Sequence, residues 1–79
     1  MELKNKIREK RFFKNQLSQA DLAEAVEVSR QTIIAIESGK FNPSVKLALQ
    51  LARYFNCPLE DVFYLEEREN GEFKMENGE

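Results

Sequence analysis

The two serines Ser18 and Ser29 constrain the fold of this 79-residue chain more than any other feature. Each stands just before a helical pattern and predicts a helix start, because a serine side chain can accept hydrogen bonds from the free N–H groups of a first helical turn. Leu22, Ala23 and Val26 give the first of these helices an apolar face. Only two residues separate its end from Ser29, so the two helices must cross at a steep angle.

The helix that begins at Ser29 is expected to end at Gly39, because glycine readily adopts the left-handed conformation that closes a helix. Ile33 and Ile36 give this helix an inward apolar face. Residues 18–39 therefore predict a helix-turn-helix, an arrangement in which the second helix is the one that enters the major groove of DNA.

Three more helices are expected around this unit, which makes the fold all-α with five helices. Leu3, Ile7 and Phe13 predict a first helix over residues 3–14. The other two are predicted over residues 44–55, where Ser44 is the cap, and over residues 58–63, which begin with a proline.

The charge of the chain is unevenly distributed. The net charge is −2, but residues 1–64 carry +2 and residues 65–79 carry −4, and residues 1–14 hold six basic side chains. Because phosphate binding depends on local potential, the negative net charge does not exclude binding to the phosphates of DNA. We expect one helix-turn-helix domain over residues 1–65 and an acidic tail over residues 66–79. Asn70-Gly71 could join residues 64–68 and 73–75 as a hairpin, and disorder is the alternative.

Composition excludes several classes of protein. The chain has no histidine and one cysteine, Cys57, so neither histidine-assisted catalysis nor an ordinary zinc site nor an intrachain disulfide is expected. We therefore expect no enzyme activity, no metal and no cofactor, and we interpret Cys57 as a small structural residue rather than a redox sensor. No apolar run reaches the length of a membrane span, and the N-terminus lacks the apolar segment of a signal peptide, so we expect a cytoplasmic protein.

Five segments of the chain resemble the Cro/C1-type repressors, also called the XRE family, over about residues 5–64. They are LSQADLA (17–23), VSRQTI (28–33), IESGK (36–40), NPS (42–44) and PLEDVF (58–63). The resemblance implies a five-helix, lambda-repressor-like fold that binds DNA as a homodimer, and it is strongest to the small one-domain, cytolysin-repressor-like members, which often carry a small terminal β element. The chain departs from the family at Glu27, where glycine is usual, at Lys10, where leucine is usual, and in a longer loop before Leu17.

The exposed face of the third helix carries the side chains expected to read bases. Arginine can donate two hydrogen bonds to guanine, glutamine can pair with adenine, and small apolar groups can contact thymine methyl groups. The alternatives are that the polar pair is merely solvated and that Ile34 packs sideways against the first helix. The predicted base-reading residues are Arg30, Gln31, Ile34 and Ala35.

Phosphate contacts are expected from polar groups that flank the third helix. For the serines the alternative is simple capping, and for Lys40 it is a solvated cation. The resemblance also implies a structural ion pair between Arg11 and Glu37; the alternative is an unpaired Glu37. The phosphate-binding residues that the resemblance implies are Gln19, Ser29, Thr32, Ser38, Lys40, Asn42 and Ser44.

A homodimer is expected because one helix reads only a few base pairs, and two half-sites lie about 34 Å apart. Three large apolar residues in a row at 63–65 cannot all be buried on one face of the fold. The alternative for Leu59 and Val62 is closure of the core. The predicted dimer surface comprises Leu59, Val62, Phe63, Tyr64 and Leu65.

The sequence therefore predicts a sequence-specific, double-stranded DNA-binding transcriptional regulator, most simply a repressor with a palindromic operator. Two other functions stay open. One is a DNA-binding antitoxin whose acidic tail grips a toxin, and the other is a protein-interaction module without DNA binding. Activation is open as well, through the acidic edge formed by Asp21, Glu24 and Glu27.

Overall fold

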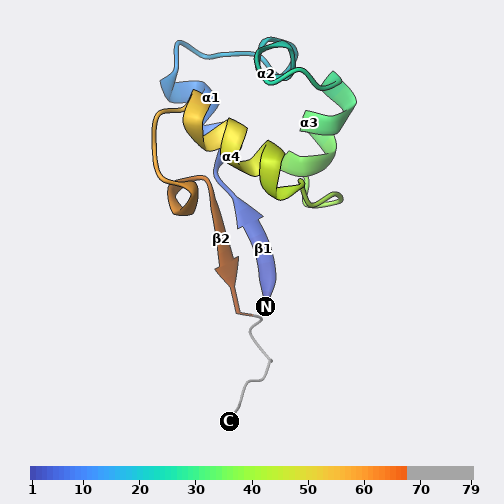
Figure 1. Cartoon of the computed structure of the whole chain (residues 1–79), viewed down its shortest axis with the longest axis vertical. Coiled ribbons are helices and arrows are strands. Elements are labelled where there is room, and N and C mark those ends of the chain that lie inside the picture. The colour runs from blue at the N-terminus through green and yellow to red at the C-terminus, as the bar shows by residue number, and fades with distance from the viewer. Residues whose placement is uncertain (68–79) are drawn as a thin grey trace, which may run out of the picture.

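The computed structural model describes residues 1–67. Four α-helices form the body, and a two-stranded antiparallel sheet projects from it (Figure 1). In chain order the elements are β1 (Glu2–Asn5), α1 (Ile7–Phe13), α2 (Gln19–Ala25), α3 (Arg30–Glu37), α4 (Val45–Tyr54), the single 3₁₀ turn η1 (Leu59–Asp61) and β2 (Phe63–Glu66).

Three serine caps define where α2, α3 and α4 begin. The Oγ atom of Ser18 accepts from the backbone N–H of Asp21 at 2.9 Å. The Oγ atoms of Ser29 and Ser44 each accept from the N–H group three residues on, both at 3.1 Å. The predicted caps are confirmed, because in each case the hydroxyl satisfies an N–H group that the helix itself leaves free.

The turn between α2 and α3 is as short as the sequence predicts. Glu27 lies in the left-handed region with φ of +62°, and the N–H of Val28 donates to the carbonyl of Ala23 at 2.9 Å. Gly39 follows the end of α3 with φ of +81°. A left-handed glutamate costs about 1 kcal/mol relative to a favoured backbone conformation, so the turn persists because the packing of both helices holds it.

The core lies where the apolar faces of α1, α2, α3 and α4 meet. The largest fully buried side chains are Ile7, Leu22, Ile33, Ile36, Leu51 and Val62. Leu3, Leu17, Val28 and Ala48 pack around them. This core fixes the orientation of α3, because Ile33 and Ile36 are buried and the opposite face of the helix must then point outward.

The predicted first helix is wrong at its N-terminal end. Residues 2–5 form strand β1, in which Leu3 pairs with Leu65 of β2. A strand forms there because β2 supplies backbone partners from the other end of the chain, and the side chain of Asn5 then accepts from the N–H of Ile7 at the start of α1. Phe13 is 82% exposed and does not extend the apolar face.

The predicted fifth helix is also wrong. Residues 59–61 form only one 3₁₀ turn, after which the chain extends into β2. The change occurs because Val62 and Phe63 enter the core, which directs the following backbone toward β1. Residues 1–67 therefore form four α-helices and a small sheet rather than five helices, and β2 agrees with the terminal β element that the resemblance implies.

The partner of β2 differs from the one considered in the sequence. Within residues 1–67 the strand Phe63–Glu66 pairs with β1, whereas the suggested hairpin partner at residues 73–75 lies outside the described residues. The division into a domain and an acidic tail stays a prediction. Every helix in the described part of the chain falls short of the length and apolarity needed to cross a membrane.

Candidate nucleic-acid interface

Helix α3 presents an outward face that differs in chemistry from its buried face. Arg30 and Gln31 at its start are exposed, and Ile34 and Ala35 are half-buried further along. Gln31, Ile34 and Ala35 lie on the outward face, and Arg30 adds a long hydrogen-bonding side chain at the edge of that face, in the first turn. Such a combination fits the edges of base pairs in a major groove.

The hydroxyl groups at the start of α3 are already engaged with each other and with the backbone. Ser29 is exposed and caps the helix, and its Oγ atom lies 3.0 Å from Oγ1 of the half-buried Thr32. A hydroxyl has one donor and two acceptor positions. Capping therefore still leaves hydrogen-bonding capacity on this pair for a phosphate.

The loop after α3 places further polar groups beside the helix. Ser38 donates its hydroxyl hydrogen bond to the carbonyl of Ala35 at 3.0 Å, and the backbone N–H of Lys40 donates to the same carbonyl at 2.9 Å. The side chains of Lys40, Asn42 and Ser44 are exposed. These bonds fix the loop against the end of α3, so its exposed groups hold a defined position relative to the helix.

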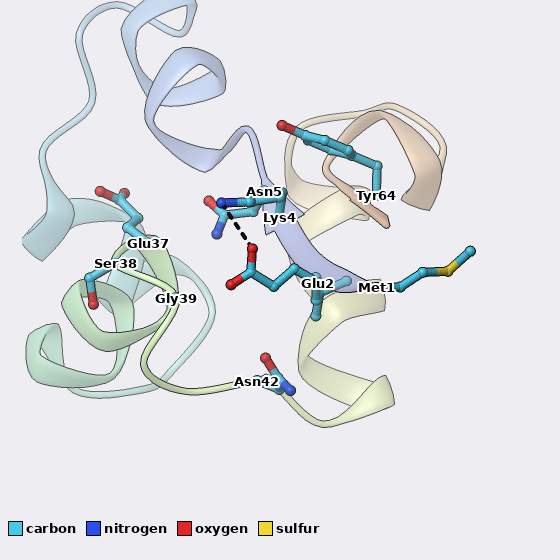
Figure 2. Close-up of a pocket in the computed structure, with 10 residues that line it drawn as sticks. Met1, Glu2, Lys4, Asn5, Glu37, Ser38, Gly39, Asn42 and Tyr64 are labelled. Carbon is cyan, nitrogen blue, oxygen red and sulfur yellow. Dashed lines mark ion pairs between the residues drawn. The ribbon is translucent and has the colours of Figure 1, made fainter. Parts of the chain in front are cut away.

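A polar hollow of about 420 Å³ separates this loop from the sheet (Figure 2). Ser38, Gly39 and Asn42 line one side, and Lys4 and Asn5 of β1 line the other. The Nδ2 group of Asn5 donates to the carbonyl of Ile36 at 2.9 Å. The end of α3 is therefore tied directly to the sheet.

Arg11 and Glu37 are brought together beneath the interface. The Nε and NH2 groups of Arg11 donate to the two carboxylate oxygens of Glu37 at 2.7 and 3.2 Å, and its NH1 group donates to the carbonyl of Leu17 at 2.8 Å. The two side chains are 16% and 11% exposed. The pair thus links α1, α3 and the segment before α2 in one bidentate, largely desolvated contact.

Gln19 joins the same network. Its Nε2 group donates to an oxygen of Glu37 at 3.1 Å, and the side chain is half-buried. Since an amide nitrogen carries two hydrogens, one remains for another acceptor. Gln19, which the sequence predicts as a phosphate ligand, therefore also ties the start of α2 to the end of α3.

The residues predicted for the dimer surface separate into two groups. Val62 and Phe63 are buried in the core of the chain itself, so they are not available to a second copy, and that part of the prediction is wrong. Tyr64 and Leu65 are 38% and 63% exposed on β2, and Leu59 is half-buried. Of the five residues predicted, these three remain candidates for a dimer surface.

Two polar residues near the interface, Asn5 and Arg8, were not predicted from the sequence to take part in it. Asn5 falls inside the predicted first helix, so its link to α3 gave no local signal. Arg8 lies on α1 beside the starts of α2 and α3, and lines a hollow with Arg30. The density of basic residues at positions 1–14 was the one signal that pointed to it.

The comparison with known proteins agrees with this geometry. The family model described as "Helix-turn-helix" matches residues 7–62. An uncharacterized HTH-type transcriptional regulator of Methanocaldococcus jannaschii is 51% identical over 67 residues, which cover 85% of this chain and all of that protein. One from Archaeoglobus fulgidus is 45% identical over 85% of this chain and 93% of its own length. YgzD of Bacillus subtilis, also called an uncharacterized HTH-type transcriptional regulator, is 48% identical over 82% of this chain and 97% of its length. The chain belongs to the Cro/C1-type (XRE) family of helix-turn-helix proteins.

Proposed function

We propose that the chain is a transcriptional repressor that binds a palindromic operator in duplex DNA as a homodimer. The observation that carries this proposal is the difference between the two faces of α3. Its buried isoleucines leave Gln31 exposed on the opposite face, and Arg30 is exposed at its first turn. The relatives at 43–51% identity that bear the name of HTH-type transcriptional regulators support the same function.

The base-reading step rests on the exposed face of α3. Arg30 can donate two hydrogen bonds to O6 and N7 of guanine, and Gln31 can pair with N6 and N7 of adenine. Ile34 and Ala35 are half-buried, so only part of each side chain reaches a thymine methyl group. Each good bidentate contact contributes about 1–3 kcal/mol of discrimination against a wrong base.

Phosphate contacts then fix the register of α3 in the groove. Ser29 and Thr32 lie at its start, and the exposed Lys40, Asn42 and Ser44 follow its end. Contacts at both ends of a recognition helix position it without reading sequence. Ser38 contributes through its hydroxyl oxygen, which keeps acceptor capacity only, so we expect it to bind phosphate less than Lys40 does.

The homodimer is supported by an apolar surface on the side of α4 and η1. A groove of about 470 Å³ is lined by Leu49, Ala52, Cys57 and Leu59, with Lys46, Gln50 and Arg53 also lining it. Leu65 is a further large apolar side chain that the chain itself leaves largely uncovered. Because dimers of this class place their recognition helices about one DNA turn apart, a symmetric dimer implies a palindromic site.

Selection of bound sequences from random duplex DNA tests this function. The expected result is a palindromic motif, and Gln31→Ala should relax one position in each half-site without abolishing binding. Glu24→Ala, an exposed change on α2, serves as the control and should leave the motif unchanged. A protein that enriches no sequence would contradict operator binding, and an enriched single half-site would contradict the homodimer.

A further inference from the structure

A hollow of about 600 Å³ lies between α1 and the starts of α2 and α3. Three arginines line it, Arg8 and Arg11 from α1 and Arg30 from α3, together with Gln19 and Glu37. We call it the arginine hollow. It adjoins the exposed face of α3, because Arg30 belongs both to that face and to the hollow.

The charges of the arginine hollow do not cancel. All three nitrogen groups of Arg11 donate within the protein, and both oxygens of Glu37 accept, so the charges of this pair neutralise each other. Arg8 and Arg30 are exposed, and neither takes part in an ion pair among residues 1–67. Two uncompensated guanidinium groups therefore face one concave surface.

We propose that the arginine hollow is a binding site for a backbone phosphate of duplex DNA, with Arg8 as its principal ligand. A guanidinium group presents parallel N–H donors that match the oxygens of a phosphate. Gln19 also lines the hollow, and the remaining N–H of its side chain offers a second donor. The inference rests on the proposed function, because it requires α3 to approach DNA.

The position of Arg8 relative to Arg30 explains why the ligand is a phosphate rather than a base. Arg30 begins the helix that enters the groove, whereas Arg8 lies on a separate element, α1, that lines the same hollow. A side chain outside the recognition helix meets the strand that borders the groove and not the base edges within it. Glu37 does not repel this phosphate strongly, since Arg11 neutralises its charge at 2.7 Å.

The salt dependence of DNA binding by Arg8→Gln tests the proposal. Because a dimer carries two copies of Arg8, the variant loses two phosphate contacts, which lowers the magnitude of the slope of log K against log salt by about 1.8. The ratio of wild-type to variant affinity should therefore shrink about twelvefold between about 50 and 200 mM salt. Affinity for the selected operator and for random duplex should fall by the same factor. Lys10→Gln removes the same charge from the same helix but does not line the hollow, and it should keep the wild-type slope.

Three results would overturn the inference. Equal slopes for Arg8→Gln and Lys10→Gln would show that Arg8 acts only through the general field of the protein. A change of base preference at one operator position would make Arg8 a base-reading residue. If wild-type protein bound no duplex DNA at all, the proposed function would fail together with the inference, whereas the first two results leave the proposed function intact.

Discussion

Asn5 and Ile36 stand 31 residues apart in the chain and are joined by a hydrogen bond of 2.9 Å from Nδ2 of the asparagine to the backbone carbonyl of the isoleucine. The same side chain accepts from the N–H of Ile7 at 3.2 Å. One side chain therefore connects the end of β1 with the start of α1 and with the last turn of α3.

Replacing Asn5 with alanine should lower the free energy of unfolding by about 2 kcal/mol, because two hydrogen bonds of about 1 kcal/mol each are lost. Asn42→Ala is a matched control, since Asn42 is exposed and lines the same hollow. It should change stability by less than about 0.5 kcal/mol. Urea denaturation measures both, and equal stabilities for the two variants would contradict the connecting role of Asn5.

Arg11→Ala should lower the free energy of unfolding by about 3 kcal/mol, because it leaves a largely buried Glu37 carboxylate without its partner. Arg11→Met combined with Glu37→Met should recover much of this loss, since no uncompensated charge then remains. Arg8→Ala removes an exposed arginine from the same helix and should have little effect on stability. An unchanged melting temperature for Arg11→Ala would show that the contact contributes nothing to the fold.

Glu27→Gly should stabilise the protein by about 0.5–1 kcal/mol, because glycine adopts the left-handed backbone of this turn without the steric cost that glutamate bears. The melting temperature should rise by about 2–8 °C for a domain of this size. Glu27→Ala, which removes the charge but keeps a Cβ atom, should not give this increase. Calorimetry of the three proteins separates the backbone effect from the charge effect.

Gly39→Ala tests the same backbone effect in the opposite direction, because it removes glycine from a left-handed position instead of placing glycine there. A Cβ atom at this glycine would meet no other atom within 4 Å, so the whole cost arises from its φ of +81°. We expect a loss of about 1 kcal/mol. A larger loss would indicate that the end of α3 moves as well.

Leu65→Lys should weaken self-association without unfolding the chain, because the leucine is 63% exposed on β2. Sedimentation velocity across a concentration series should show the wild-type dimer and a variant shifted toward monomer. Phe13→Lys, at an 82% exposed position on α1, is the control and should associate like wild type. A wild-type monomer at high micromolar concentration would exclude the dimer, and equal association of both variants would exclude the surface on β2.

The helix-turn-helix could be predicted from the sequence because its signals are local. Ser18, Ser29 and Gly39 each act within one helical turn of their own position, and the structure confirms all three. The sheet could not be predicted in the same way. The pairing of Leu3 with Leu65 depends on a partner at the other end of the chain, and a four-residue segment carries no periodicity that separates a strand from a helix.

The candidate interface was only partly visible in the sequence. The exposed face of α3 follows from the positions of Ile33 and Ile36, which fix the buried side. The prediction of the Arg11–Glu37 contact rested on the family resemblance and not on the spacing of residues in the sequence. Arg8 was not predicted because its importance arises from the hollow that it shares with Arg30, which only the tertiary fold creates.

The pairing of Glu2 with Glu66 has a mechanical consequence. Both ends of the described chain leave the sheet at the same place, so a force that separates them would open the ladder one pair at a time, from Glu2–Glu66 toward Asn5–Phe63. Each backbone bond contributes only about 1 kcal/mol, and sequential rupture requires little force. The last pair to open contains Asn5, so tension on the ends would reach α3 only after the rest of the sheet had unzipped.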